Sequence, residues 1–241
     1  MDASRFARLF DHSILRPDAS PEEVGRFAAA AIRLGTATLT VQPHYVQFAA
    51  ERLRGSRVRV GAVIAFPHGN ETPGMKVFQA REVIDHGADE IDMVMNIPAL
   101  KGGEMAWFLR DVEGVVLAAR GKTVKVILEN CYLSQDEKRR ACEWIAQAGA
   151  QFVKTSTGFG PGGATVEDVR LMYDAVKGRC QVKASGGIRD IHQVVELYKA
   201  GARRFGSSRS EELVRAFDEL APGERAVWAE PQDKTQPSST S

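Results

Sequence analysis

Two lysines stand at or near the ends of short apolar runs, about one strand–helix unit apart in the chain. Lys154 follows Phe-Val and precedes Thr-Ser-Thr-Gly, and Lys183 precedes Ala-Ser-Gly-Gly. A buried lysine is costly unless its amine has a partner or a chemical role. Two such lysines on neighbouring strands would repel each other, which favours the neutral, nucleophilic amine on one of them. The pair therefore predicts an enzyme that forms a Schiff base with a carbonyl substrate.

A carboxylate and a third lysine fall on the two preceding predicted strands. Alternation along residues 89–96 places Asp92 opposite the apolar residues that helices would cover, and alternation along 124–130 does the same for Lys125. Any one of these residues alone is better explained by a structural ion pair. Three cations around one carboxylate are a poor stabilising device, because an unpaired buried charge costs roughly several kcal/mol. The group therefore favours catalysis over a purely structural network.

The loops that follow the last three predicted strands are rich in glycine and serine. Backbone N–H groups of such loops commonly bind phosphate at this end of a barrel. One Gly-Gly pair usually marks a tight turn, whereas small-residue loops on adjacent strands favour a phosphate site. Arg189 and Arg209 would add positive charge there, although solvated arginines fit equally well. The predicted phosphate-binding residues are Gly158, Gly186, Gly187, Gly206, Ser207 and Ser208.

Three other reactive side chains have weaker interpretations. His12 ends the first predicted strand, where a structural Asp11–His12 hydrogen bond explains it better than a role in the site. His68 follows the third strand and would help to shape the pocket. Cys131 follows the fifth strand, but no histidine is paired with it, which argues against a cysteine nucleophile. The five histidines show no metal-ligand spacing, so we expect no metal site.

Eight short β-prone segments alternate with amphipathic segments along almost the whole chain. The helical segments begin at hydroxyl caps such as Ser20, Ser134 and Thr165, and they end at glycines. Eight units of roughly 25 to 30 residues predict an α/β fold, a single (β/α)8 TIM barrel. A doubly wound open sheet is less favoured, because no G-x-G-x-x-G motif follows the first strand. The predicted strands are residues 9–14, 37–41, 58–64, 90–95, 123–128, 151–155, 181–184 and 203–205.

Length and composition bound the domain organisation. The 241 residues, 44% of them hydrophobic, can bury one sizeable core. We predict one barrel domain over residues 1–220. The composition then shifts to Pro, Gly, Ser and Thr, and we predict a flexible, disordered tail over residues 221–241.

Charge and hydropathy argue against several classes of partner. The formal net charge is +1 and no basic run stands out, so a nucleic-acid partner has no support. No stretch is apolar enough to span a bilayer, and the first residues lack a secretory-signal pattern. Three cysteines without metal or redox spacing favour a reducing compartment. We therefore expect a cytoplasmic enzyme with small-molecule partners. Barrels of this type often pair, so a homodimer is an open expectation.

The chain resembles the deoxyribose-phosphate aldolases, a family of class I (Schiff-base) aldolases. The most specific matches are Phe152-Val-Lys-Thr-Ser-Thr-Gly158 and Gly87-Ala-Asp-Glu-Ile-Asp-Met-Val94. Further matches follow in order along nearly the whole chain up to the tail, at residues 11–18, 41–43, 66–69, 125–129, 162–165, 183–187 and 204–208.

The resemblance implies the reversible cleavage of 2-deoxy-D-ribose 5-phosphate to D-glyceraldehyde 3-phosphate and acetaldehyde, with no metal or organic cofactor. Carried over by motif, Lys154 is the Schiff-base lysine, and Lys183 is the neighbour that lowers its pKa and exchanges protons. Asp92, acting through a water and supported by Lys125, would be a proton donor and acceptor. The partners implied are a sugar phosphate and acetaldehyde.

Some residues depart from the family pattern, and two other functions remain open. Thr40 stands where many relatives have cysteine, Asn130 where threonine is common, and Arg209 where a small residue is usual. These changes bear on pocket shape, phosphate contact and substrate preference.

One alternative is a Schiff-base aldolase that acts on a different sugar phosphate. The other is a phosphosugar-binding barrel without catalysis, which would need neither the lysines nor Asp92.

Overall fold

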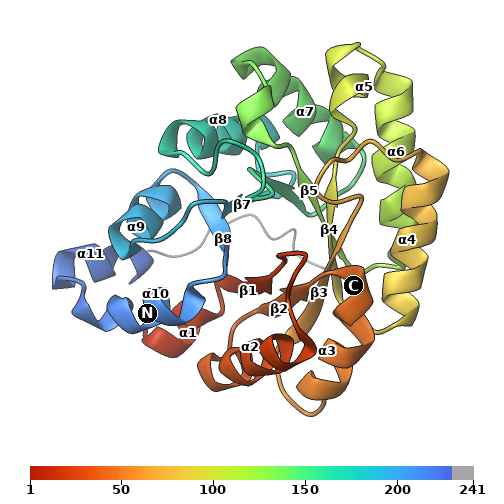
Figure 1. Cartoon of the computed structure of the whole chain (residues 1–241). Helices are drawn as coiled ribbons and strands as arrows, with labels where there is room; N and C mark the ends of the chain where they lie inside the picture. The colour runs from red at the N-terminus through yellow and green to blue at the C-terminus, as the bar shows by residue number, and fades with distance from the viewer. Residues whose placement is uncertain (230–241) are drawn as a thin grey trace, which may run out of the picture.

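Eight parallel strands form a closed barrel in the computed structural model, which describes residues 1–229 (Figure 1). The strands are β1 (Phe10–Ile14), β2 (Thr38–Val41), β3 (Arg59–Ile64), β4 (Glu90–Val94), β5 (Thr123–Ile127), β6 (Phe152–Lys154), β7 (Gln181–Ser185) and β8 (Ala202–Ser207), and each overlaps its predicted segment. Neighbours pair in sequence order, and β1 pairs with β8 to close the ring. The predicted (β/α)8 TIM barrel is therefore confirmed, and an open sheet is excluded.

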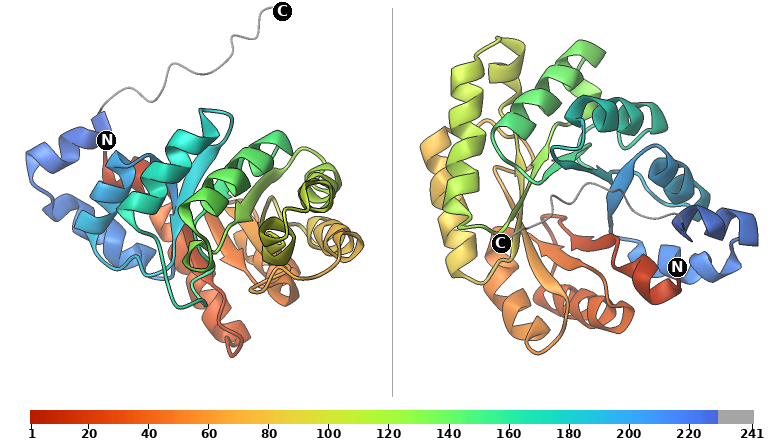
Figure 2. Two further views of the ribbon diagram at one scale, coloured as in Figure 1. Left: turned by 90° about the horizontal axis from the view of Figure 1, so that it is seen from above. Right: turned by 180° about the vertical axis from the view of Figure 1, so that it is seen from behind.

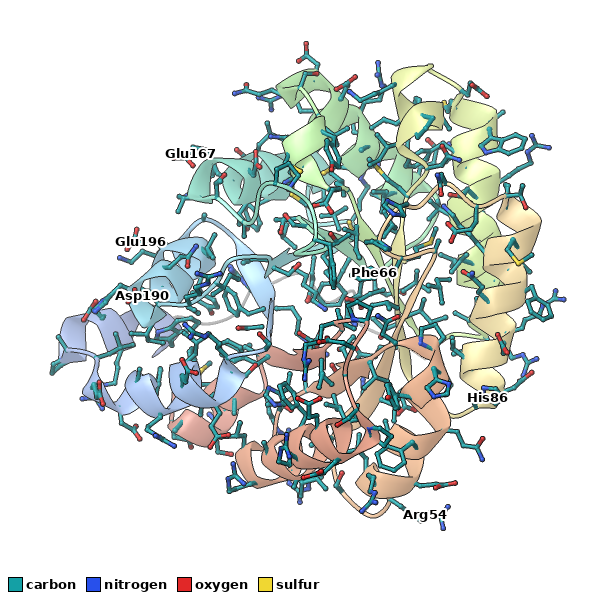
Figure 3. The ribbon with its side chains drawn as sticks, viewed as in Figure 1. Arg54, Phe66, His86, Glu167, Asp190 and Glu196 are labelled. Carbon is teal, nitrogen blue, oxygen red and sulfur yellow. The ribbon has the colours of Figure 1, made fainter. Side chains whose placement is uncertain are left out.

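Helices surround the barrel as an outer ring (Figures 1 and 2). The helices that connect successive strands are α2 (Pro21–Leu34), α3 (Val46–Leu53), α4 (Pro73–Asp85), α6 (Met105–Ala118), α7 (Gln135–Gln147), α8 (Val166–Val176) and α9 (Ile191–Lys199). The remaining elements are α1 (Ala3–Ala7), α5 (Ile97–Lys101), α10 (Ser210–Ala216), α11 (Pro222–Ala226) and the 3-10 turns η1 (Pro43–Tyr45), η2 (Asn130–Tyr132), η3 (Phe217–Glu219) and η4 (Val227–Ala229). Charged side chains such as Glu167 and Glu196 point outward from this ring (Figure 3).

The helices begin at the predicted caps. Ser20 and Ser134 each accept a hydrogen bond from the third helical N–H, and the side chains of Glu23 and Glu137 complete the two capping boxes. Thr165 caps α8 through its hydroxyl. The glycines predicted to end helices adopt the left-handed backbone region, which side-chain-bearing residues rarely enter. Local sequence therefore sets where each helix meets the next strand.

The two faces of the central strands carry different kinds of side chain. Ile91 and Met93 of β4 are fully buried in the apolar layer between strands and helices. Because side chains alternate along a strand, Asp92 between them faces the inside of the barrel, as predicted. The alternation in β5 turns Lys125 inward in the same way. The apolar layer thus supports the barrel from outside, and its interior is left for polar groups.

The C-terminal boundary differs from the prediction. Residues 222–229 continue as α11 and η4, and Trp228 is only 3% exposed. Its ring packs on Phe6 and Tyr198, at centroid distances of 5.1 and 4.0 Å. The predicted tail was therefore wrong for residues 222–229. Composition was misleading because Pro222 occupies the first turn of a helix, where proline is favoured. The rest of the predicted tail, residues 230–241, lies outside the described residues.

Replacing Trp228 with alanine should destabilise the protein by about 3–5 kcal/mol, the usual cost of deleting a large buried aromatic side chain. The measurement is the free energy of unfolding in urea. Trp107, which is half-buried on α6, provides the control, and its replacement by alanine should cost less. Equal losses for the two variants would show that Trp228 does not anchor the C-terminal turns.

No helix within residues 1–229 has the length and apolar character that are needed to cross a membrane.

Candidate active site

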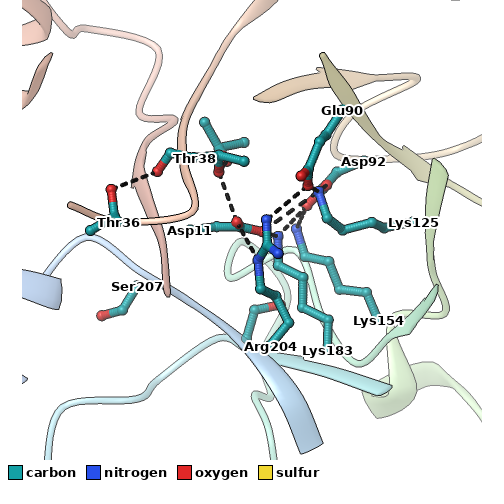
Figure 4. A network of polar contacts seen from close by, with 12 residues as sticks. Asp11, Thr36, Thr38, Glu90, Asp92, Lys125, Lys154, Lys183, Arg204 and Ser207 are labelled. Atoms are coloured by element: carbon teal, nitrogen blue, oxygen red, sulfur yellow. Dashed lines mark hydrogen bonds and ion pairs between the residues drawn. The ribbon is translucent and has the colours of Figure 1, made fainter. Parts of the chain in front are cut away.

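The four ionisable residues predicted for the site meet inside the barrel (Figure 4). Lys154 and Lys183 are register partners on β6 and β7, and Asp92 and Lys125 are register partners on β4 and β5. The Nζ atoms of Lys154 and Lys183 donate to the same oxygen, Oδ2 of Asp92, over 2.7 and 2.6 Å. Lys125 donates to Oδ1 over 2.8 Å. The carboxylate of Asp92 is therefore the common acceptor of three buried lysines.

Three more charged residues, which were not predicted from the sequence, join this group. Asp11 accepts from Lys183 and from Nε of Arg204, the latter over 2.7 Å. Glu90 accepts from Lys125 over 2.6 Å and from Arg204 over 2.9 Å. Alternation could have indicated Glu90, because it lies two residues before Asp92 on the same strand face. The expected group of three cations and one carboxylate thus becomes one of four cations and three carboxylates.

Lys154 is the cation of this group whose amine is most easily neutralised. Burial is the largest influence and lowers the pKa of Lys154 to about 8; the Asp92 carboxylate opposes this effect, and the charges of Lys183 and Lys125 add to it. Desolvation therefore contributes more than Lys183, which is the cause predicted from the sequence. About one amine in ten is then neutral at pH 7, compared with about one in three thousand for an ordinary lysine.

Asp92 and Lys125 keep their charges. Burial alone would raise the pKa of Asp92, but Lys125, Lys154 and Lys183 hold it well below its usual value. Burial alone would lower the pKa of Lys125, but Asp11, Asp92 and Glu90 raise it instead. A reactive amine therefore lies beside an ionised carboxylate at neutral pH.

A cavity of about 670 Å³ opens next to the two lysines. The loops after β1, β6, β7 and β8 line it, and both Lys154 and Lys183 contribute to its wall. Gly186 and Gly187 have φ of 89° and 74°, a region in which glycine is favoured. The carbonyl of Gly186 also accepts from the backbone of Ala164 over 3.0 Å, which joins two of the loops. All of the predicted phosphate residues line this cavity: Gly158, Gly186, Gly187, Gly206, Ser207 and Ser208.

The three residues that depart from the family pattern occupy different positions. Thr40 lines the cavity, and its hydroxyl shares a hydrogen bond of 2.8 Å with Thr38. Arg209 lines the cavity with an exposed side chain, 3.6 Å from Glu212. Asn130 is buried and does not line the cavity. Thr40 and Arg209 are therefore placed to affect a bound substrate directly.

The Asp11–His12 interpretation is wrong. Successive strand residues face opposite sides, so Asp11 enters the barrel whereas His12 lies outside it. The His12 ring stacks on Phe27 at 4.6 Å, and its buried Nδ1 has no hydrogen-bond partner within residues 1–229. His68 and Cys131 are exposed, and neither lines the cavity. The sequence expectation that His68 shapes the pocket is not met.

Acid should destabilise the protein partly through His12. Burial lowers the pKa of His12 to about 4, from 6.5. Between these values the unfolded chain binds more protons than the folded chain, so stability falls as the pH falls through this window. Wild type should lose about 2 kcal/mol more than the H12F variant between pH 7 and pH 5, measured by urea unfolding. Parallel stability curves for the two proteins would contradict the assignment.

The barrel and its cavity place the protein among the (β/α)8-barrel enzymes. Residues 6–209 match the DeoC/LacD family aldolases. The chain belongs to this family and is an aldolase.

Named relatives cover almost the whole chain. A deoxyribose-phosphate aldolase of Staphylococcus epidermidis is 45% identical over 212 residues, which are 88% of this chain and 96% of that protein. One from Thermococcus gammatolerans is 47% identical over 212 residues, which are 86% and 94% of the two chains. Among solved structures, the deoxyribose phosphate aldolase of Aeropyrum pernix, described as tetrameric, superposes with a TM-score of 0.84. It is 30% identical, and the match covers 91% of this chain and 94% of that one.

Proposed function

We propose that this protein catalyses the reversible cleavage of 2-deoxy-D-ribose 5-phosphate to D-glyceraldehyde 3-phosphate and acetaldehyde through an imine on Lys154. The observation that carries the proposal is the position of the Lys154 amine. It donates to the Asp92 carboxylate, in the wall of a cavity that glycine- and serine-rich loops also line. The names of relatives that are 42–47% identical support the same substrate.

The reaction begins when the neutral amine of Lys154 adds to the aldehyde carbon of the open-chain sugar. Protonation of the adduct's hydroxyl and loss of water give a protonated imine at C1, which withdraws electrons from the bond between C2 and C3. Cleavage of the bond between C2 and C3 leaves its electron pair in an enamine on Lys154, and C3 leaves as the aldehyde of glyceraldehyde 3-phosphate. Protonation of the enamine at C2 and hydrolysis of the imine release acetaldehyde.

Proton transfer in this scheme belongs to Asp92 and Lys183. Asp92 is ionised and can accept the C3 hydroxyl proton through one water. Lys183 lies 2.6 Å from the same carboxylate oxygen and lines the cavity, so it can return a proton to the substrate side. Lys125 supports the pair by occupying the other oxygen of Asp92. The two oxygens of one carboxylate thus have separate tasks.

The remote phosphate would bind at the loops after β6, β7 and β8. Glycines of these loops line the cavity, where backbone N–H groups commonly bind phosphate, and Arg189 and Arg209 in its lining add positive charge. Binding of the phosphate would hold the aldehyde carbon at the other end of the sugar near Lys154, because binding energy from a remote group can orient the reacting atoms.

Two measurements on the purified protein test the proposal. The first compares retro-aldol rates on 2-deoxyribose 5-phosphate, on 2-deoxyribose and on other sugar phosphates. The second treats the enzyme with acetaldehyde and borohydride and maps the reduced adduct by peptide mass spectrometry. We expect cleavage of the 5-phosphate and an adduct on Lys154. Faster cleavage of another sugar phosphate would favour the alternative aldolase, and binding without an adduct would favour a non-catalytic barrel.

A negative charge at Ser208 should weaken phosphate binding selectively. Ser208 is exposed and lines the cavity, so the S208D variant places a carboxylate against the incoming phosphate. We expect KM for the phosphorylated sugar to rise by about 10-fold or more, since like charges at close range cost on the order of 1 kcal/mol or more. KM for 2-deoxyribose should not change. A similar rise for both sugars would place the phosphate elsewhere.

Assembly and location follow as smaller parts of the proposal. A homodimer is expected from the fold class, and the Aeropyrum pernix relative is described as tetrameric. Light scattering after size-exclusion chromatography distinguishes these states. A cytoplasmic location fits an enzyme whose substrates are small phosphorylated sugars, and cell fractionation tests it.

A further inference from the structure

Arg204 joins two of the three carboxylates of the charged cluster, Asp11 and Glu90 (Figure 4). Its Nε donates to Oδ1 of Asp11 over 2.7 Å, and its terminal nitrogen donates to Oε2 of Glu90 over 2.9 Å. The side chain is 15% exposed. Asp11 also holds Lys183, and Glu90 also holds Lys125. Arg204 is therefore linked to two of the three lysines that contact Asp92, Lys125 and Lys183, although it does not line the cavity.

The charges of this cluster do not cancel. Its cations are Lys125, Lys154, Lys183 and Arg204, and its carboxylates are Asp11, Glu90 and Asp92. Four positive and three negative charges leave a net charge of +1, which becomes zero when Lys154 is neutral. Lys125 and Lys183 each contact two or more of these carboxylates, whereas Lys154 contacts Asp92 alone. The geometry therefore makes Lys154 the cation that the cluster can most easily lose.

Charged groups face Lys154 from every strand that contributes to the cluster. Asp92 and Glu90 come from β4, and Lys125 comes from β5. The list is completed by Lys183 of β7, Arg204 of β8 and Asp11 of β1. At the end of β5, the carboxylate of Glu129 is bound by the backbone and hydroxyl of Thr157, and within residues 1–229 it forms no ion pair. The balance around Lys154 therefore rests on these residues.

We propose that Arg204 is a positioning residue for the aldolase reaction. Its guanidinium, held between Asp11 and Glu90, supplies the positive charge that leaves Lys154 as the surplus cation of the cluster. Without Arg204, three cations and three carboxylates would balance with Lys154 charged. Glu90 has the opposite effect, because its loss would increase the positive surplus. The proposal rests on the imine function of Lys154.

The test measures how borohydride-trapped acetaldehyde on Lys154 varies with pH, by peptide mass spectrometry. The R204Q variant should shift the midpoint of trapping upward by about one pH unit, the order expected for one buried charge a short distance away. The E90Q variant should shift the midpoint downward by a similar amount. The R204Q/E90Q double variant removes equal and opposite charges, so its midpoint should lie near that of wild type.

A purely structural role predicts a different pattern. Damage to packing would reduce trapping in each single variant and further in the double variant, without opposite shifts in the midpoint. The R204K variant keeps the charge and loses the two-pronged geometry, so it should keep the wild-type midpoint and remains informative if R204Q does not fold. Unmoved midpoints in R204Q and E90Q would overturn the proposal. No adduct on Lys154 in wild type would instead overturn the proposed function.

Discussion

Replacing Lys154 with leucine should reduce the rate of aldol cleavage by at least about four orders of magnitude, as expected when a covalent nucleophile is removed. Lys183 also reaches the cavity, but Asp11 and Asp92 both bind its amine, whereas Lys154 contacts Asp92 alone. We therefore expect that Lys183 does not replace Lys154 as the nucleophile. The measurement is kcat with 2-deoxyribose 5-phosphate, combined with borohydride trapping of acetaldehyde.

Stability separates this effect from misfolding. The K154L variant leaves three cations and three carboxylates in the cluster, so it should be at least as stable as wild type in urea. The K154R variant keeps the charge without the nucleophile, and it should also lack an adduct. An adduct on Lys183 in the leucine variant, or cleavage at a substantial rate, would assign the chemistry to another amine.

Replacing Asp92 with asparagine should reduce cleavage by about 10²- to 10⁴-fold, the usual contribution of a general acid–base group. The imine should still form. The negative charge of Asp92 raises the pKa of Lys154, so its removal lowers that pKa and increases the neutral fraction at pH 7. Trapping of acetaldehyde by D92N should therefore equal or exceed that of wild type, whereas turnover falls.

Asp111 provides a matched control for this variant. It is also fully buried and accepts from a lysine, Lys76, over 2.6 Å, but it lies on α6 in the helical layer and does not line the cavity. The D111N variant should lose stability, because it leaves Lys76 as an uncompensated buried cation. Its ratio of cleavage to trapping should stay at the wild-type value. A comparable fall in this ratio for D111N would show that the loss in D92N reflects general damage.

The alternation of side chains along the strands and the order of the strands were sufficient to predict four residues of the site: Asp92, Lys125, Lys154 and Lys183. Asp92 and Lys125 could be oriented because apolar neighbours on both sides of each mark the outer face of the strand. Lys154 and Lys183 could be paired because their strands are adjacent in sequence and parallel. Sequence patterns thus identified the site residues whose orientation depends on their own strand or on the next strand along the chain.

The contact between Asp11 and Arg204 depends on closure of the barrel. Asp11 and Arg204 come from the first and last strands, which pair only when the barrel closes. No periodicity within either segment encodes that contact. The predicted hydrogen bond between Asp11 and His12 was wrong, because adjacent residues of a strand face opposite sides. The burial of Trp228 was missed for a similar reason, since its partners Phe6 and Tyr198 lie far away in sequence.

The pairing of β1 with β8 completes the charged cluster, because the last strand supplies Arg204. A nascent polypeptide that ends after β7 already carries Lys154 and Lys183, yet it lacks Arg204 and the last of the loops that line the cavity. The reactive amine thus acquires its full electrostatic environment only when the final strand joins the first.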